Sequence, residues 1–217
     1  MRPEVLLLDV GGVVIRTPFE LHRGFEIAAG LDPGTLDWLG PHDPTGDPLW
    51  RSLLAGDITE RGYWDRRVGE IAELTGDRGL TMQQYCRVAY GQDETAIVRP
   101  EALETIDLAE SLGVRFAILT NDLHAFHGAD WVDSISVFSR ADPLIDCGRL
   151  GVLKPDPGAY AAALERLGCQ PDGVLFVDDQ PANVAAAREA GIPTIEFDVT
   201  DPVGSFAQVT AILREAG

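Results

Sequence analysis

The amino-acid sequence predicts an α/β protein, with a parallel sheet flanked by helices and a helical segment inserted near its start. Three apolar runs, Val5–Leu8, Phe116–Leu119 and Val174–Val177, have the length and continuity of strands buried on both faces. After Pro100, helical patterns alternate with such runs, which is typical of a parallel sheet with right-handed crossovers. Between Thr17 and Val98 the sequence has helical patterns and no β-rich run.

The elements after residue 98 have recognisable start and stop signals. The helix expected at Pro157–Leu167 has Asp156 as its N-cap, proline at its first position and Gly168 just past its end. In the same way, Gly113 stands just past the end of the helix expected at Glu101–Leu112. The other expected elements are helices at Trp131–Val137 and Ala182–Ala190, and strands at Val114–Leu119, Leu144–Asp146 and Thr194–Phe197.

The inserted segment is expected to consist of helices separated by breaks at glycine and proline. The turn residues between Leu39 and Pro48 predict a loop, and Thr59 can cap the helix that follows it. We therefore expect an α/β core made of residues 1–16 and 99–217, and a helical domain made of residues 17–98. The helices expected in that domain are Leu21–Ala29, Pro48–Ala55, Thr59–Leu74 and Thr81–Ala89.

Bulk composition limits the function classes. The chain has 217 residues and a formal net charge of -18, so non-specific binding to nucleic acid or to an anionic membrane is not expected. Its three cysteines have no metal-binding spacing, and an odd number favours reduced thiols. No run approaches the roughly 18 apolar residues of a membrane span, and the apolar run near the amino end is too short for a signal peptide. We expect a soluble, cytoplasmic protein whose partner is a small molecule, and the sequence indicates no oligomeric state.

Four short polar stretches carry the predicted site. Three directly follow strand-like runs: Asp9-Val-Gly-Gly, Thr120-Asn121 and Asp178-Asp179. The fourth, Lys154-Pro-Asp-Pro, comes before a helix. In open α/β sheets, ligands bind at the carboxyl ends of the strands. Acids, a hydroxyl, an amide and a lysine gathered there predict a site for a metal ion and a phosphate.

In this order, the stretches resemble those of the haloacid dehalogenase superfamily, whose members are mostly Mg²⁺-dependent phosphatases. The resemblance covers nearly the whole chain and implies a Rossmann-like core. It implies that Asp9 is the nucleophile and forms an aspartyl-phosphate, that Thr120 holds the phosphate, and that Lys154 steadies both. The remaining assignments that follow are Asn121 and Gly12 for phosphate, and Asp9, the Gly11 carbonyl, Asp178 and Asp179 for Mg²⁺.

The inserted segment is identified by the same resemblance as the cap of capped subfamily I. The run Trp50…Gly56-Asp-Ile-Thr-Glu…Tyr63-Trp64 is similar to the caps of sugar-phosphate phosphatases and of the N-terminal phosphatase domain of soluble epoxide hydrolases. This implies that the cap chooses the substrate, for which a sugar phosphate is a candidate. His22, Arg23 and the Trp38–Trp50 loop are its expected substrate contacts.

Gly11 departs from the family pattern, which has a second aspartate at this position. Glycine keeps the carbonyl but removes an acid/base that is typically worth about 10²–10⁴ in rate. Three functions therefore remain open: a Mg²⁺-dependent phosphatase of a small metabolite, a metal-free haloacid dehalogenase-type hydrolase, and a weak or silent binding protein. The acid pair disfavours the second, because its charge would be uncompensated without a cation. Intact Asp9, Thr120 and Lys154 disfavour the third.

The remaining candidates are expected to be structural. The four histidines lack ligand spacing, so we expect no zinc site, and the acid-rich stretch Asp142–Asp146 is expected to be solvated. Each site residue also has an ordinary alternative: Asp9 and the acid pair as turn or helix caps, and Lys154 as a surface lysine.

Overall fold

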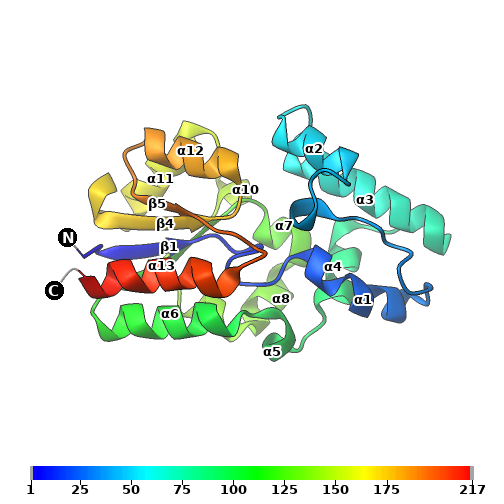
Figure 1. Ribbon diagram of the computed structural model, residues 1–217, viewed down its shortest axis with the longest axis horizontal. Helices are drawn as coiled ribbons and strands as arrows, with labels where there is room; N and C mark the ends of the chain where they lie inside the picture. The colour runs from blue at the N-terminus through cyan, green and yellow to red at the C-terminus, as the bar shows by residue number, and fades with distance from the viewer. Residues whose placement is uncertain (1, 216–217) are drawn as a thin grey trace.

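A computed structural model describes residues 2–215. Its centre is a five-stranded sheet in the order β3-β2-β1-β4-β5, in which every neighbouring pair is parallel (Figure 1). The strands are β1 (Val5–Leu8), β2 (Arg115–Thr120), β3 (Leu144–Asp146), β4 (Val174–Asp178) and β5 (Thr194–Glu196). The predicted α/β fold is confirmed. The strand order runs outward from β1 in both directions, to β2 on one side and to β4 on the other. Such a reversal leaves a crevice at the carboxyl ends of the strands, where ligands bind in open α/β sheets.

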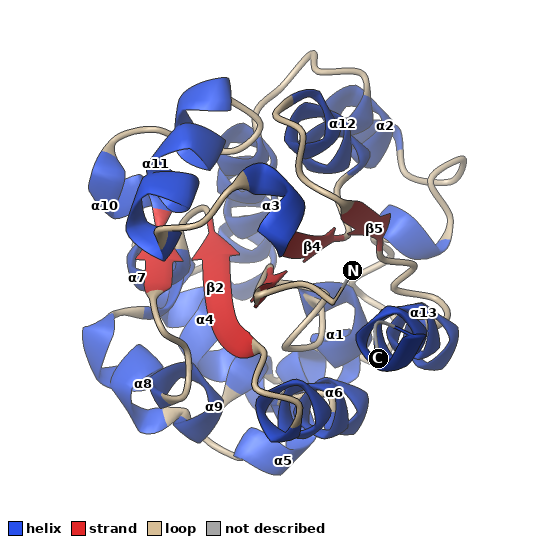
Figure 2. Cartoon of the chain, turned by 90° about the vertical axis from the view of Figure 1, so that its left-hand side faces the viewer, coloured by secondary structure: helices blue, strands red, loops and turns tan. Residues whose placement is uncertain are grey.

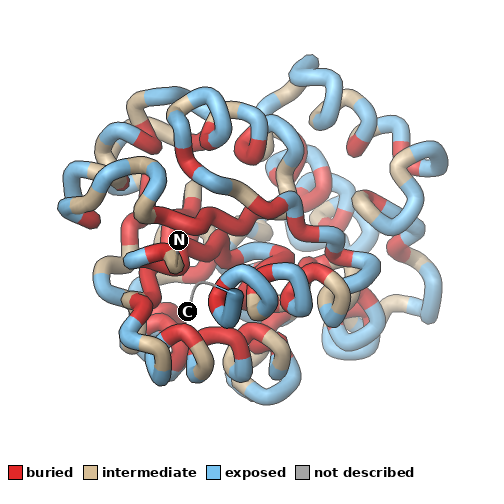
Figure 3. Tube along the Cα trace, turned by 60° about the vertical axis from the view of Figure 1, so that its left-hand side comes forward, coloured by how far each residue is buried: buried red, intermediate tan, exposed pale blue. Residues whose placement is uncertain are grey.

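Helices cover both faces of the sheet, which explains the continuous apolar runs of its strands (Figure 2). On one face, α6 (Pro100–Ser111) and α13 (Pro202–Glu215) pack with Leu6 and Leu8 of β1. On the other face, α11 (Pro157–Leu167) and α12 (Pro181–Glu189) pack with Leu7. All four residues of β1 are fully buried, as the tube in Figure 3 shows for the centre of the sheet. Within residues 2–215, no helix has both the length and the apolar character needed to cross a membrane.

Between Thr17 and Val98 the described chain has helices and no strand of the sheet. These helices are α1 (Pro18–Ala29), α2 (Pro48–Leu54), α3 (Glu60–Thr75), α4 (Met82–Tyr90) and α5 (Glu94–Ile97), with a 3₁₀ turn, η1 (Gly40–His42), before α2. A side chain caps each of these five α-helices: Thr17 and Thr81 form capping boxes, and the Thr59 hydroxyl accepts a hydrogen bond from the Gly62 amide. Asp47 and Asp93 cap α2 and α5 in the same way. The helices lie together beyond the carboxyl ends of β1 and β4 (Figure 1).

The chain enters and leaves this helical segment along adjacent paths. The Arg16 amide donates to the Ile97 carbonyl at 2.8 Å, and the Arg99 amide donates to the Val14 carbonyl at 3.0 Å. The Arg99 side chain is buried and holds the junction, because its guanidinium bonds the Gly12 carbonyl at 2.9 Å and pairs with Glu20 at 2.7 Å. A bidentate arginine of this kind fixes orientation as well as distance.

The segment between β2 and β3 differs from the prediction. The single helix expected at Trp131–Val137 is wrong: the chain forms α8 (Ala129–Ser134) and α9 (Ser136–Ser139), because Ile135 between them is extended, with φ -92° and ψ 113°. The other elements that the prediction did not name are α5, the 3₁₀ turn η1, α7 (Leu123–His127), α10 (Cys147–Leu150), the 3₁₀ turn η2 (Pro171–Gly173) and the carboxyl-terminal helix α13.

Candidate active site

Lys154 is the centre of the site. Its Nζ donates to Asp9 Oδ1 at 2.7 Å, to Asp178 Oδ2 at 2.6 Å and to the Leu119 carbonyl at 2.9 Å. An ammonium group has three protons, so all of them are used. Burial alone would lower the pKa of Lys154, but Asp178 and Asp9 raise it above its ordinary value. Lys154 is therefore a fixed positive charge that links β1, β2 and β4, and the surface-lysine alternative is wrong.

Three carboxylates gather around this single ammonium. Asp9, Asp178 and Asp179 each offer an oxygen, and these atoms all lie within 4.8 Å of one another. Burial raises the pKa of Asp9 to about 7, Lys154 opposes the shift and Asp178 adds to it. Burial, Asp178 and Asp9 raise the pKa of Asp179 well above its usual range. The donor set therefore has uncompensated negative charge and only oxygen ligands, which fits a hard divalent cation such as Mg²⁺.

Asp178 is held by its own loop as well as by Lys154. Its Oδ1 accepts hydrogen bonds from the Gln180 amide at 2.8 Å and from Asn183 Nδ2 at 3.0 Å. The side chain is completely buried. Asp178 is thus a rigid support on which Lys154 and the neighbouring Asp179 are positioned.

Thr120 and Asn121, at the end of β2, have different surroundings. Thr120 lines the pocket, and its hydroxyl has no hydrogen-bond partner within residues 2–215, so it is available to a ligand. The Asn121 side chain is fully engaged: Oδ1 accepts from the Lys154 amide at 2.8 Å, while Nδ2 donates to the Lys154 carbonyl at 3.1 Å and to Glu60 Oε2 at 3.2 Å. In this arrangement Asn121 ties the Lys154 loop to β2, and its side chain is not free for the phosphate contact expected from the sequence.

The two glycines after β1 also differ. Gly12 has φ 81°, and a Cβ there would lie 2.9 Å from Asp179 Oδ2, closer than real Cβ contacts. Gly11 lies outside the positive-φ region, and a Cβ there would meet nothing within 4 Å. Gly12 is therefore required by its surroundings, whereas Gly11 leaves open space at the edge of the pocket.

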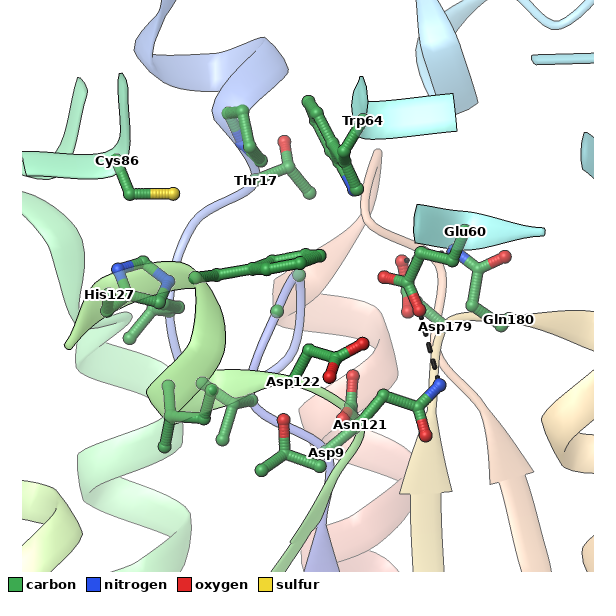
Figure 4. Close-up of a pocket in the computed structure, with 18 of the residues that line it drawn as sticks. Asp9, Thr17, Glu60, Trp64, Cys86, Asn121, Asp122, His127, Asp179 and Gln180 are labelled. Carbon is green, nitrogen blue, oxygen red and sulfur yellow. Dashed lines mark hydrogen bonds between the residues drawn. The ribbon is translucent and has the colours of Figure 1, made fainter. Parts of the chain in front are cut away.

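A pocket with a cavity volume of about 100 Å³ lies between this carboxylate cluster and the helical segment (Figure 4). Its core side is polar, and its opposite side is mostly apolar and aromatic. The lining residues from outside the predicted site include Thr17, Pro18, Phe19, Pro41, Trp50, Leu53, Glu60, Trp64, Met82, Cys86, Tyr90, Phe126 and His127. Pro41 and Trp50 belong to the loop expected to contact the substrate, but His22 and Arg23 are not among the lining residues.

His22 and Arg23 have other surroundings. The His22 ring is buried edge-on against Phe19 and Trp38, with centroid distances of 5.5 and 5.1 Å. Arg23 is largely exposed and lies 3.9 Å from Glu26. The aromatic packing inside the helical segment, rather than the pocket, explains the position of His22.

Two consecutive residues at the start of α3 contact two consecutive residues after β2. Glu60 accepts the hydrogen bond from Asn121, drawn as a dashed line in Figure 4. Arg61 forms a two-point ion pair with Asp122, with Nε 2.8 Å from Oδ2. Burial raises the pKa of Glu60, while Asn121 opposes the shift. Sequence reasoning did not assign these residues, although the run Gly56-Asp-Ile-Thr-Glu that marks the segment ends on Glu60.

The stretch Asp142–Asp146 is not uniformly solvated, because Asp146 is buried. It accepts hydrogen bonds from the His124 amide at 2.9 Å and the Gly148 amide at 3.0 Å, and its Oδ2 lies 2.7 Å from His124 Nδ1. Asp146 thereby fixes the start of α7 and of α10. Asp156 caps α11 as predicted, accepting from the Gly158 amide at 2.7 Å.

Known proteins with similar sequences include phosphatases. The plasmid protein CbbY of Cupriavidus necator is 35% identical over 216 residues, covering 91% of this chain and 79% of that protein. The phosphoglycolate phosphatase of Pseudomonas syringae pv. tomato is 24% identical, covering 89% and 68%. Mouse acyl-CoA dehydrogenase family member 10 is 24% identical over 89% of this chain, which spans only 18% of the mouse protein.

Solved structures share the fold at lower identity. A predicted HAD-like family hydrolase from Porphyromonas gingivalis has a TM-score of 0.57 and 22% identity, covering 99% of both chains. L-2-haloacid dehalogenase from Xanthobacter autotrophicus has the same TM-score and identity, covering 91% of this chain and 78% of its own. A HAD family enzyme from Bacteroides thetaiotaomicron, in complex with magnesium and inorganic phosphate, has a TM-score of 0.53 and 22% identity, covering 91% and 95%. The sequence pattern of one family matches residues 4–191, across the whole carboxylate cluster, and the chain belongs to that family, the haloacid dehalogenase-like hydrolases.

Proposed function

We propose that this hydrolase is a Mg²⁺-dependent phosphatase that acts on a small phosphorylated metabolite through an aspartyl-phosphate on Asp9. The observation that carries the proposal is the cluster of three carboxylates around Lys154. A phosphate monoester is a dianion, and it would be repelled by this cluster unless a cation were bound. The similarity to phosphoglycolate phosphatases favours the same reaction class.

The residues divide the work of phosphoryl transfer, which is mainly positioning and charge stabilisation. Asp9, Asp178, Asp179 and the Gly11 carbonyl would hold Mg²⁺, which when bound would neutralise charge on the phosphoryl oxygens. The second oxygen of Asp9 attacks phosphorus while Lys154 keeps Asp9 oriented. The Thr120 hydroxyl donates to a phosphoryl oxygen. Water then hydrolyses the aspartyl-phosphate and regenerates Asp9.

We further propose that residues 17–98 act as a cap domain on a core made of residues 1–16 and 99–217. The apolar residues of α1, α2, α3 and α4 cover the pocket and exclude water, which strengthens each charge interaction inside it. Since Trp50, Leu53 and Met82 contribute to this side, they are the groups that would select among phosphorylated metabolites.

Dehalogenation is the second candidate, because haloacid dehalogenases share the fold. According to the family resemblance described for the sequence, that reaction also uses an aspartate nucleophile but needs no metal. Asp178 and Asp179 argue against it, because a metal-free site would leave both near Asp9 with only Lys154 to compensate them.

A substrate panel separates the two reactions. Phosphorylated metabolites, p-nitrophenyl phosphate and 2-haloacids are incubated with the protein in Mg²⁺ and in excess chelator, and phosphate or halide release is measured. We expect phosphate release that needs Mg²⁺ and is lost in Asp9→Asn. Quenching the reaction of a ³²P-labelled substrate with acid should trap the aspartyl-phosphate, so the wild-type protein should carry ³²P and Asp9→Asn should not. Halide release in chelator, or phosphate release that Asp9→Asn retains, would overturn the proposal.

A further inference from the structure

The proposed reaction needs a proton donor for the leaving oxygen, and Gly11 has no side chain to supply one. Four acidic residues line the pocket among residues 2–215. Two of them are assigned to the nucleophile and the metal site, and Arg61 holds a third, Asp122, in a two-point ion pair. The four are Asp9, Glu60, Asp122 and Asp179, which leaves Glu60 without a role.

Glu60 has the geometry of a positioned acid. It is the first residue of α3, directly after the N-cap Thr59, so its backbone is fixed by the helix start. Oε2 accepts the hydrogen bond from Asn121, whereas Oε1 has no hydrogen-bond partner within the described residues. In Figure 4 the carboxyl group points from the helical segment toward the polar end of the pocket, where Asp179 lies.

The contact between Glu60 and Asn121 also divides the site from its surroundings. An outer groove runs between α2, α3 and the loops before α11 and α12, and Glu60, Asn121 and Asp122 line both this groove and the inner pocket. A substrate that enters from the groove must pass these residues. Glu60 therefore reaches its place only when the start of α3 lies against the loop after β2.

We propose that Glu60 is the general acid and base of the reaction, supplied by the helical segment in place of the side chain missing at Gly11. This inference rests on the proposed phosphatase function. Burial raises the pKa of Glu60, which favours the protonated form needed for the first step.

Both steps balance with this assignment. In the first, an Asp9 oxygen bonds phosphorus, the bond from phosphorus to the leaving oxygen breaks, and that oxygen takes its electron pair and the Glu60 proton. The products are an alcohol, the aspartyl-phosphate and the Glu60 carboxylate. In the second, Glu60 takes a proton from water as the water oxygen bonds phosphorus, and the electron pair of the broken bond returns to Asp9. Inorganic phosphate and protonated Glu60 result.

The test is the dependence of Glu60→Gln on the leaving group. Glutamine keeps the size of the side chain and an oxygen for Asn121, but has no acidic proton. Single-turnover cleavage of an alkyl phosphate should fall by about 10²-fold or more. Cleavage of p-nitrophenyl phosphate should fall by less than about fivefold, because nitrophenolate leaves without a proton. With excess p-nitrophenyl phosphate, nitrophenolate release by Glu60→Gln should begin with a burst and continue at a slower steady rate. The later rate is slow because hydrolysis of the aspartyl-phosphate still lacks a base.

Two matched variants separate acid catalysis from closure. Arg61→Gln removes the neighbouring contact of α3 and keeps the acid, so it should slow both substrates by the same factor. Gly11→Asp in the Glu60→Gln background places a carboxyl group where a Cβ has open space, and it should restore alkyl phosphate cleavage at least tenfold. Gly11→Ala in that background should restore nothing.

The results can separate the role of Glu60 from the proposed phosphatase function. A wild type that releases no phosphate from either substrate in Mg²⁺ would overturn both. A wild type that is active, with Glu60→Gln slowed equally on alkyl and aryl phosphates or slowed on neither, would overturn only the role of Glu60. A selective loss that Arg61→Gln reproduces in full would assign Glu60 to closure alone.

Discussion

The two sides of the pocket are built in different ways. On the core side, polar groups hold one another in place: Lys154 links Asp9 to Asp178, and Asn121 holds the backbone of Lys154 through two hydrogen bonds. On the side of the helical segment, aromatic and aliphatic groups predominate, and Glu60 and Arg61 are the polar residues that reach across to the loop after β2.

This difference separates two requirements of an enzyme. A network in which every donor is used keeps reacting groups within the small tolerances that phosphoryl transfer needs. Apolar walls tolerate substitution as long as volume is roughly kept, so they can change without disturbing the network. The core side therefore fixes the reaction, and we expect the opposite side to determine which molecule undergoes it.

The largest effect is expected from breaking the core network at Lys154. Lys154→Met leaves Asp9 and Asp178 buried without their cation, and loss of one partner of a buried ion pair costs about 3–5 kcal/mol. The free energy of unfolding, measured in urea without Mg²⁺, should fall by that amount, and phosphatase activity should be lost.

Asp9→Asn is the matched control for this prediction. It abolishes the nucleophile but leaves Lys154 paired with Asp178. It also removes a carboxylate whose pKa burial has raised to about 7, so burying the ionised form costs free energy that asparagine does not. Its unfolding free energy should stay within about 1 kcal/mol of the wild type. Equal destabilisation by the two variants would show that Lys154 does not hold the core side together.

A smaller effect should distinguish the adjacent glycines. Gly12→Ala places a Cβ against the Asp179 carboxylate at φ 81°, which costs about 1–2 kcal/mol of stability and displaces Asp179. We expect the Mg²⁺ concentration for half-maximal activity to rise about tenfold. Gly11→Ala should leave both quantities nearly unchanged, and a comparable loss in both variants would contradict the argument from Gly12 geometry.

The core side was largely predictable from the sequence because its signals are local. Asp9, Thr120 and Asp178 each follow an apolar run, and parallel strands bring their carboxyl ends to one edge of the sheet. The pairing of Lys154 with both Asp9 and Asp178 needed the structure, since no spacing along the chain encodes which carboxylates a lysine joins. The engagement of the Asn121 side chain was missed for the same reason.

The opposite side was less predictable because apolar helices carry the same pattern whether they face a pocket or a core. Trp50 of α2 lines the pocket, while Trp38, at the other end of the same predicted loop, packs on His22. Glu60 resembled any acidic residue in the first turn of a helix, where a carboxylate is ordinarily favoured by the helix dipole. Its contact with Asn121 and its place in the pocket distinguish it, and both needed the structure.

His22 should affect stability at low pH and leave activity at pH 7 unchanged. The sequence suggested this residue as a substrate contact, and the structure buries it among aromatic rings. Burial lowers the pKa of His22 to about 4, well below that of an exposed histidine, and Nε2 has no hydrogen-bond partner within residues 2–215. Between about pH 6.5 and pH 4, His22 is therefore protonated in the unfolded chain but neutral in the folded protein. Stability that is complete above about pH 6.5 should be lost as the pH falls, by at most about 1.4 kcal/mol per pH unit.

His22→Phe removes this group while retaining an aromatic ring for Phe19 and Trp38. Urea unfolding of both proteins at pH 7 and pH 5 isolates the contribution of His22, because the remaining titrating groups are common to the two. The wild type should lose about 1–2 kcal/mol more than the variant over this interval. The Michaelis constant at pH 7 should not change, since the ring does not line the pocket. A stability difference that is independent of pH would contradict the lowered pKa of His22. A raised Michaelis constant would show instead that His22 contributes to substrate binding.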